Sequence, residues 1–536
     1  MWRRCCLALL GAVPLPAQPA VAWTRGATCY EVFVRSFQDS DGDGIGDLNG
    51  LISRLDYIND GKPNSPTSLG ARCIWLMPVA ESPSYHGYDV SDYYRVNHAY
   101  GTNADFTHLV AEAHRRGIKV LVDLVLNHSS SEHPYFRAAL RDTASPYRAW
   151  FRWSPTRPSE LNPWGQSNWR KSPVRDEWYY AFFDTHMPDL NYRHPPVVAE
   201  AKKIARFWLA DMHVDGFRLD AVSYLVEEPG RIMHTAGTHA VLREFERYVR
   251  AVKPGAFTVG EMSDGIEVLY GYYPDQLDSY FAFEVADSIV AAVRNGSARG
   301  LLSPLLRLQA RLPRDRWAMF VRNHDQVRSR TAVGGDVRRA QLATTLLLTM
   351  PGLPFLYYGE EIGMVGSKPD ERLRTPMQWS AEVGGGFTRG TPWERFQYDS
   401  LTTTVSAQEH DPASLLNTTR ALVHLRATAP PLARGLLLPV TASADAVAAY
   451  LRREGRHAVL VVVNLGADTV RNVTLSSAAQ AVPPGLWTLH DMRGAAIAAP
   501  LCVRAGGQLK DFSPMPALAP LTAYLFALQS TARAAC

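Results

Sequence analysis

Short apolar segments alternate with amphipathic ones between residues 29 and 358. In one amphipathic segment Phe106, Leu109 and Ala113 share a face, and Gly117 ends the pattern, as in a helix. The short apolar segments are rich in β-branched and aromatic residues, which is typical of strands at 30–37, 73–77, 119–125, 216–219, 257–259, 280–283, 318–321 and 353–357. Strands that alternate with helices in this way predict an α/β fold, a parallel (β/α)8 TIM barrel.

Two stretches of the chain depart from this alternation. Residues 128–191 are rich in Trp, Pro, Ser and Arg without helical periodicity, and indicate a small domain inserted after the third strand. After a last helix near 413–427 the pattern changes to alternating β-type segments separated by turn residues, which predicts a C-terminal antiparallel β-sandwich. We therefore expect a barrel at 23–127 and 192–428, an inserted domain at 128–191 and a sandwich at 429–536.

The N-terminus has the pattern of an export signal. Two arginines lie at positions 3 and 4, residues 5–13 are apolar, and residues 20–22 fit a small-x-small cleavage site. The apolar run is too short to span a bilayer. We expect residues 1–22 to be a signal peptide on a secreted or periplasmic protein without a membrane anchor.

Four cysteines remain after that segment, and an exported protein can hold them as disulfides. Four cysteines allow three pairings. Cys29 and Cys73 each lie near the start of a predicted strand and could be neighbours in a sheet, although two buried free thiols would fit equally well. The four are Cys29, Cys73, Cys502 and Cys536.

Composition narrows the class of protein. Of the 536 residues 46% are hydrophobic, enough for a substantial core, which excludes a disordered chain. The net charge is only +4 and no basic stripe is present, which argues against a nucleic-acid partner. The 13 Trp and 23 Tyr would suit a surface that stacks on sugar rings, but large cores also use aromatic residues.

Acidic residues follow four of the predicted strands directly. Asp123 ends the third strand, Asp220 the fourth, Glu261 the fifth and Asp325 the seventh. The active site of a barrel enzyme lies at the C-terminal ends of the strands, so all four side chains should converge on one site at that face of the barrel. One such carboxylate could simply cap a helix. Four together oppose folding by mutual repulsion, which favours a catalytic explanation.

The segments around these carboxylates resemble the four catalytic segments of the α-amylase family, glycoside hydrolase family 13. They are Asp123-Leu-Val-Leu-Asn-His128, Gly216-Phe-Arg-Leu-Asp220, Gly260-Glu261 and Asn323-His-Asp325. Residues 85–89, 187–191 and 352–361 resemble further segments of that family. The similarity runs from about residue 29 to residue 379 and agrees with the predicted barrel.

The resemblance implies a role for each residue. Asp220 matches the nucleophile, Glu261 the general acid and Asp325 the carboxylate that binds and distorts the sugar. Retention of configuration requires the first two about 5–5.5 Å apart. The resemblance places Arg218 beside the nucleophile, and the other substrate-site residues are Tyr88, Asp89, Asp123, His128 and His324.

A separate acidic loop predicts a calcium site. Alternating carboxylates with intervening glycines wrap oxygen atoms around a hard cation. The loop also resembles the calcium loop of the oligo-1,6-glucosidase branch, and an acidic turn without metal is the alternative. The ligands would be the side chains of Asp39, Asp41, Asp43 and Asp47 and the carbonyl of Ile45, and the Ca²⁺ would be structural.

Specificity markers point in two directions. Tyr85 and Ala221 replace residues typical of exo-acting and α-1,6-specific relatives, and residues 187–191 resemble the neopullulanase branch. Residues 372–379 and the acidic loop resemble the oligo-1,6-glucosidase branch instead. We therefore expect a monomeric, intermediate-type retaining hydrolase that cleaves α-1,4 bonds of starch or maltooligosaccharides. The alternatives are an exo-acting α-glucosidase or transglucosylase and, from another class, a non-catalytic glucan-binding relative.

Overall fold

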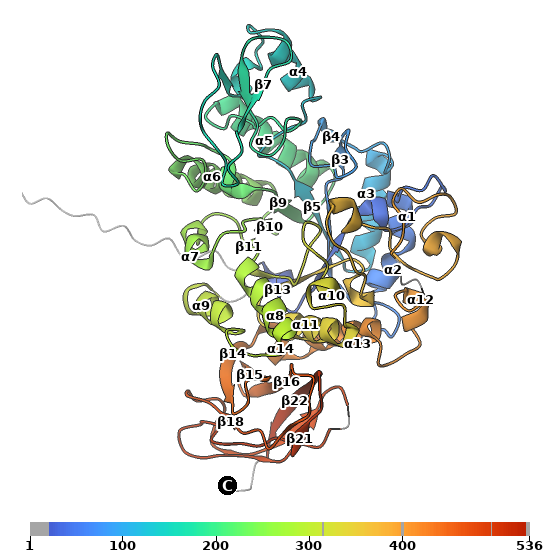
Figure 1. Ribbon diagram of the computed structural model, residues 1–536, viewed down its shortest axis with the longest axis vertical. Helices are drawn as coiled ribbons and strands as arrows, with labels where there is room; N and C mark the ends of the chain where they lie inside the picture. Colours follow the sequence, from blue (N-terminus) through green and yellow to red (C-terminus); the bar gives the residue numbers. More distant parts are fainter. Residues whose placement is uncertain (1–20, 314–315, 398–400, 495, 532–536) are drawn as a thin grey trace, which may run out of the picture.

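The computed structural model describes residues 21–313, 316–397, 401–494 and 496–531. Residues 1–20, which hold most of the predicted signal peptide, lie outside this part. Within it, no helix combines the length and the apolar character that crossing a bilayer requires. Figure 1 shows three regions along the long axis: the segment after β5 at one end, the barrel in the middle and a β-domain at the other end.

The predicted barrel is confirmed. Its sheet has the order β11-β10-β9-β5-β2-β1-β13-β12, with every neighbouring pair parallel. A parallel bridge between Phe281 and Ala318 joins the two outer strands and closes the sheet. The strands are β1 (Cys29–Val32), β2 (Cys73–Leu76), β5 (Lys119–Leu124), β9 (Gly216–Leu219), β10 (Phe257–Gly260), β11 (Ser279–Tyr280), β12 (Ala318–Met319) and β13 (Leu353–Tyr357).

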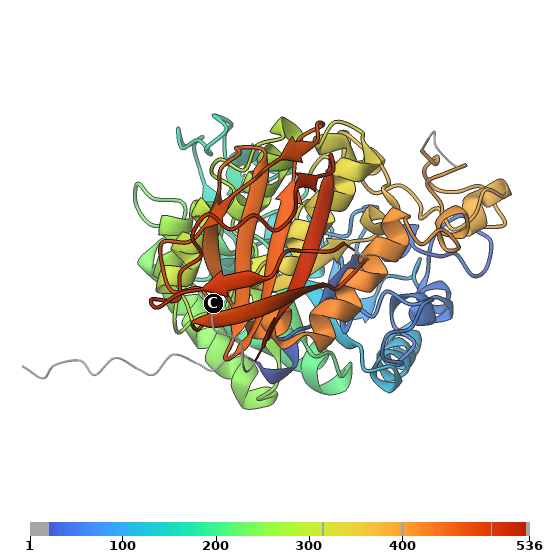
Figure 2. The ribbon, with the colours of Figure 1, turned by 90° about the horizontal axis from the view of Figure 1, so that it is seen from below.

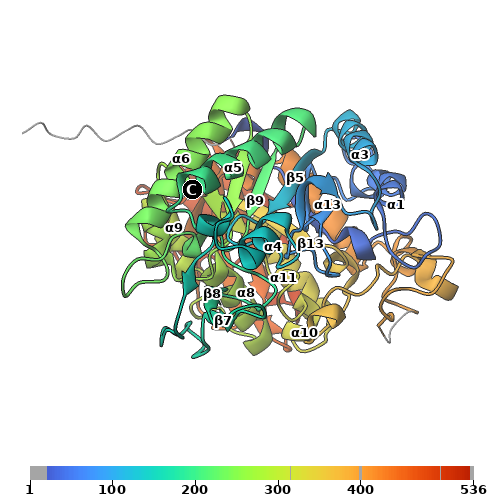
Figure 3. The same cartoon turned by 90° about the horizontal axis from the view of Figure 1, so that it is seen from above.

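Helices surround these strands, as the view along the barrel in Figure 3 shows. Thr102 and Asp105 form a capping box at the start of α3, which fixes the helix where its sequence predicts it. The longer helices are α3 (Asn103–Arg115), α5 (Pro195–Arg206), α6 (Ala236–Val252), α8 (Phe283–Asn295), α9 (Ser303–Arg311), α11 (Val337–Thr349) and α13 (Leu415–Thr428). The shorter ones are α1 (Leu48–Ser53), α2 (Leu55–Ile58), α7 (Ile266–Leu269), α10 (Ser329–Ala332), α12 (Val405–Gln408) and α14 (Pro430–Arg434).

The segment 128–191 leaves the barrel at the end of β5 and packs around its own aromatic residues. Phe136 contacts Phe151, Trp153 and Tyr179 with ring centroids 4.9–5.7 Å apart. The segment contains the helix α4, which the sequence did not predict. With only eight residues, α4 is too short to show a helical period in the sequence. Its elements are α4 (Pro134–Arg141) and the sheet of β6 (Trp153–Ser154), β8 (Trp178–Tyr180) and β7 (Trp169–Lys171), beside the hairpin of β3 (Ala80–Glu81) and β4 (Asp92–Val96).

The C-terminal region is antiparallel β-structure, as predicted (Figure 2). Leu460, Val462 and Phe526 are fully buried in a core separate from that of the barrel. One sheet contains β18 (Leu475–Ser476), β14 (Leu436–Ala442), β15 (Val447–Glu454), β16 (His457–Asn464), β22 (Thr522–Ser530), β19 (Gly485–Asp491) and β20 (Leu501–Val503). A second sheet pairs β17 (Val470–Arg471) with β21 (Ala517–Leu518).

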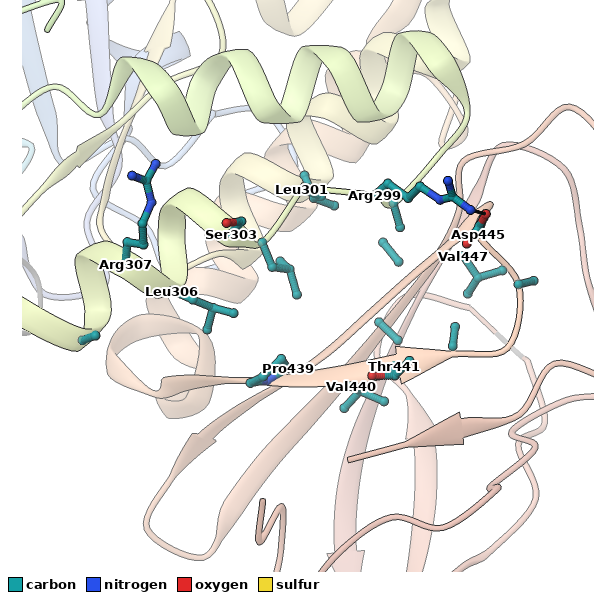
Figure 4. Close-up of a pocket in the computed structure, with 18 residues that line it drawn as sticks. Arg299, Leu301, Ser303, Leu306, Arg307, Pro439, Val440, Thr441, Asp445 and Val447 are labelled. Atoms are coloured by element: carbon teal, nitrogen blue, oxygen red, sulfur yellow. Dashed lines mark ion pairs between the residues drawn. The ribbon is translucent and has the colours of Figure 1, made fainter. Parts of the chain in front are cut away.

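The barrel and the C-terminal region meet along α9 and β14. A cavity of about 640 Å³ lies between them (Figure 4). Its wall is mainly aliphatic, with Leu301 and Leu306 on one side and Val440 and Val447 on the other. An ion pair of 2.6 Å between Arg299 and Asp445 crosses one end.

One disulfide is defined at the bottom of the barrel. Cys29 and Cys73 are direct neighbours in the register of β1 and β2, and their sulfur atoms are bonded. The alternative of free thiols is therefore wrong for this pair. Cys502 is also disulfide-bonded, and Cys536 lies outside the described residues.

Candidate active site

A cavity of about 310 Å³ opens where the barrel strands end. Asp220 follows β9, Glu261 follows β10, and Asp325 lies in the loop after β12. Parallel strands end on the same side of a barrel, so the three carboxylates reach one space. The full lining is His86, Tyr88, His128, Phe183, Asp184, Met187, Asp220, Glu261, Asp325, Asp370 and Arg374.

Arg218 holds the carboxylates together from below the cavity. Its Nη1 lies 2.7 Å from Asp220 Oδ1 and 2.9 Å from Asp123 Oδ1. Its Nη2 lies 2.8 Å from Glu261 Oε2. A planar guanidinium presents several donors in a fixed fork, which fixes the carboxylates that it binds relative to one another. Asp220 and Glu261 are therefore held side by side from adjacent strands.

His324 lies buried behind the cavity, next to Asp325. Its Nδ1 donates to Glu31 Oε1 at 2.6 Å, and its Nε2 lies 3.1 Å from Asp325 Oδ2. Burial lowers the pKa of His324, but the charges of Asp325 and Glu31 outweigh burial and raise this pKa to about 9. His324 is therefore a cation at neutral pH and holds Asp325 ionised beside it.

Tyr88 connects His324 with Asp123. Its hydroxyl lies 2.6 Å from His324 Nε2 and donates to Asp123 Oδ2 at 3.0 Å. The tyrosine ring stacks on the imidazole with centroids 5.6 Å apart. Four direct contacts thus run from Glu31 through His324, Tyr88 and Asp123 to Arg218, and keep the ring of Tyr88 fixed at the cavity wall.

Asp325 has a second cation beside it. Arg374 donates from Nη2 to Asp325 Oδ1 at 2.7 Å, and from Nε to the carbonyl of His324 at 3.1 Å. Burial alone would raise the pKa of Asp325. His324 and Arg374 overcome burial and hold that pKa far below its usual range. Asp325 is therefore an anion across the working pH range.

Glu261 has the opposite electrostatic environment. Burial raises its pKa most, Arg218 opposes this, and the nearby charges of Asp220 and Asp325 raise it further, to about 7. Burial also raises the pKa of Asp220, while the ion pair with Arg218 lowers it. One guanidinium cannot neutralise three carboxylates, so one of the three retains its proton most readily. Of the three predicted catalytic carboxylates, Glu261 is therefore the one placed to carry a proton near neutral pH, while Asp325 is ionised there.

The structure brings all nine residues of the predicted site together in two layers. Five line the cavity directly: Tyr88, His128, Asp220, Glu261 and Asp325. The other four lie behind it, where Arg218, Asp123 and His324 form the network above. Asp89 accepts hydrogen bonds from Ser82 and Ser84. His128 donates from Nε2 to the carbonyl of Tyr88 at 3.1 Å, and burial lowers its pKa to about 4, so it is neutral.

Sequence reasoning missed Glu31, Asp370 and Arg374 as parts of the site. Glu31 carried a usable signal, because it is a charged residue in the middle of an otherwise apolar strand. It is 1% exposed in β1. Asp370 and Arg374 lie on the loop after β13, whose path between strand and cavity has no periodic pattern to follow.

The acidic loop before α1 brings three of its predicted ligands together. Carboxylate oxygens of Asp39, Asp41 and Asp43 lie within 4.8 Å of one another. Asp47 lies outside this group, because it accepts from the backbone amides of Ser40 and Gly50 and caps α1. The three clustered groups are hard oxygen donors, so the loop fits a calcium ion.

Comparison with known proteins agrees with this geometry. Residues 31–435 match the alpha-amylase catalytic domain. Alpha-amylase 3 of Dictyoglomus thermophilum is 39% identical over 448 residues, which cover 83% of this chain and 85% of that protein. The trehalose synthase/amylase TreS of Mycobacterium tuberculosis is 35% identical over 515 residues, which cover 85% and 83%. The crystal structure of the alpha-amylase from H. orenii superposes with a TM-score of 0.82 at 38% identity, covering 94% of this chain and 99% of that one.

Proposed function

Because the chain belongs to the α-amylase family of glycoside hydrolases, we propose that it is a retaining hydrolase of α-1,4-glucosidic bonds. Its substrates are starch and maltooligosaccharides. The observation that carries the proposal is the bridge made by Arg218, which fixes Asp220 on one nitrogen and Glu261 on the other. Retaining hydrolysis needs such a pair, one group as nucleophile and one as acid.

The chemistry divides between the two carboxylates. Asp220 Oδ attacks the anomeric carbon and forms an ester bond as the glycosidic C–O bond breaks. Glu261 gives its proton to the departing oxygen. The Glu261 carboxylate then takes a proton from a water molecule, whose oxygen attacks the same carbon and releases Asp220. Asp325, kept anionic by His324 and Arg374, stabilises the positive charge that develops on the sugar ring.

The same proposal includes a structural Ca²⁺ at Asp39, Asp41 and Asp43. We expect EDTA to lower the melting temperature by about 2–5 °C, since loss of a ligand bound only by the folded state removes its stabilisation. Calorimetry with and without the chelator measures this. The double variant Asp41→Asn/Asp43→Asn should melt at one temperature in both conditions. An unchanged wild-type melting temperature would exclude the bound ion.

Export is the remaining part of the proposal. The arginine pair, the apolar run and the small-x-small site at residues 20–22 support secretion or a periplasmic location. An oxidising compartment would also suit the Cys29–Cys73 disulfide. N-terminal sequencing of the protein from its native host tests this, and a mature protein that still begins at residue 1 would contradict it.

A second candidate function is transfer of the glucosyl unit to a sugar or exo-acting release of glucose. The similarity to a trehalose synthase/amylase favours it. Maltoheptaoside blocked at its non-reducing end distinguishes the two functions. We expect internal cleavage to shorter blocked products, because Tyr85 stands in place of the carboxylate that is typical of exo-acting relatives. Its hydroxyl accepts from Arg374, which lines the cavity. Chromatography that shows no cleavage of the blocked substrate but turnover of the free one would establish the exo-acting alternative.

A further inference from the structure

A row of aromatic side chains leads from the catalytic cavity to the protein surface. Phe183 lines the cavity, and its ring centroid lies 4.8 Å from that of Phe182. Phe182 contacts Tyr224 at 4.2 Å and Trp164 at 5.5 Å. The row therefore begins at the wall of the catalytic cavity and ends at Trp164.

The row lies on the side of the cavity where Glu261 acts. Tyr224 belongs to the short segment that follows Asp220, and the first amide of this segment, that of Ala221, donates to Glu261 Oε2 at 3.4 Å. The hydroxyl of Ser223 donates to Asp264 on the loop after β10 at 3.5 Å. A general acid faces the oxygen that departs, so groups gathered around Glu261 face the leaving part of the substrate.

Trp164 is unusual in its exposure. It is 62% exposed, and no other Trp or Phe in the described part of the chain is exposed to a comparable degree. A single exposed apolar residue normally needs no explanation. This one is connected through the buried Phe182 to Phe183, which lines a cavity that binds sugars in the proposed function. A large flat ring is suited to stacking on a sugar.

The loop around Trp164 is built to hold it in place. The buried Asn162 accepts from the amides of Trp164 at 3.1 Å and Gln166 at 2.8 Å through its side-chain oxygen. The backbone amide of Asn162 donates to the carbonyl of Gln166 at 2.8 Å, and a bridge joins Leu161 to Ser167. These hydrogen bonds therefore hold the base of the turn in place, while the indole of Trp164 remains accessible to solvent.

We propose that Trp164 is a stacking platform for the leaving-group side of an α-glucan chain, beyond the glucose units that reach Phe183 and Tyr224. The proposal rests on the function proposed above. It makes Trp164 a residue that determines preference for long chains, because only a substrate that extends several units past the cleavage point can reach it.

Titration calorimetry with maltoheptaose and maltose on the inactive Asp220→Asn background tests the platform without turnover. Adding Trp164→Ala should weaken maltoheptaose binding about 3- to 10-fold, the range of an aromatic contact, and leave maltose binding unchanged. Trp164→Leu, which keeps apolar contact with Phe182 but has no ring face, should behave like the alanine variant. Trp164→Tyr should retain most of the affinity.

Leu161 supplies the matched control, because it is 54% exposed on the same turn. Leu161→Ala should bind both sugars as the parent does. Equal loss for maltose and maltoheptaose in the Trp164 variants would indicate a structural role and overturn the platform, as would unchanged binding of both. Turnover of maltoheptaose by the wild type is measured separately, so a failure of the proposed hydrolase function is distinguished from a failure of the platform.

Discussion

Replacing Asp220 with asparagine is expected to lower kcat on maltoheptaose by at least about 10⁴-fold. The change removes the oxygen anion that forms the bond to the anomeric carbon, and an amide is too weak a nucleophile to replace it. Steady-state assays with enough enzyme to detect residual activity measure the loss. Binding of maltoheptaose should persist, since the cavity keeps its shape.

The same variant should remain folded, with a melting temperature equal to or above that of the wild type. Asp220 shares Arg218 with Asp123 and Glu261, so removing one charge reduces repulsion among the buried carboxylates. Asp211→Asn is the matched control, because this aspartate is exposed and precedes β9, away from the cavity. Near-wild-type kcat in purified Asp220→Asn would refute the assignment of the nucleophile.

Replacing Glu261 with glutamine is expected to lower kcat/KM on starch by about 10²–10⁴-fold, the usual contribution of a general acid. The pH profile should change with it. Burial and nearby carboxylates raise the pKa of Glu261 to about 7, so the wild type should lose activity as the pH rises above that value and the acid loses its proton. Glu261→Gln should lack this alkaline decline, because an amide does not titrate.

Glu246 offers a control with the same chemistry in another place. Burial and Asp278 raise its pKa to about 7 as well, but it lies on α6 and contacts Arg250 and Thr258. Glu246→Gln should leave both the rate and the alkaline decline in place. If Glu261→Gln retained the wild-type profile, the proton would have to come from another residue.

The barrel could be predicted because its strands and helices are short and locally determined. Thr102 and Asp105 cap α3, and the apolar runs of β9 and β13 begin and end as the sequence indicates. The first strand was predicted too long, since residues after Val32 turn into the 3₁₀ helix at Val34–Ser36. Apolar runs do not distinguish a strand from the buried turn that follows it.

The centre of the site was predictable for a related reason. Asp123, Asp220, Glu261 and Asp325 sit where strands or their loops end, and barrel topology brings those positions together. Arg374 belongs to the family-like segment 372–379, but its position in the cavity, like that of Asp370, was not predictable, because the path of this loop depends on tertiary contacts. The role of Glu31 also required the structure, since its partner His324 lies 293 residues away in the chain.

The central claim is that Asp220 forms a covalent bond to the sugar while Glu261 moves the proton. The most direct measurement uses Glu261→Gln with α-maltosyl fluoride, whose fluoride leaves without a proton, so the first step proceeds and the second is slow. Peptide mass spectrometry of the quenched reaction should then find a maltosyl group on Asp220. A label on a different carboxylate, or release of the inverted sugar with no labelled peptide, would contradict the account.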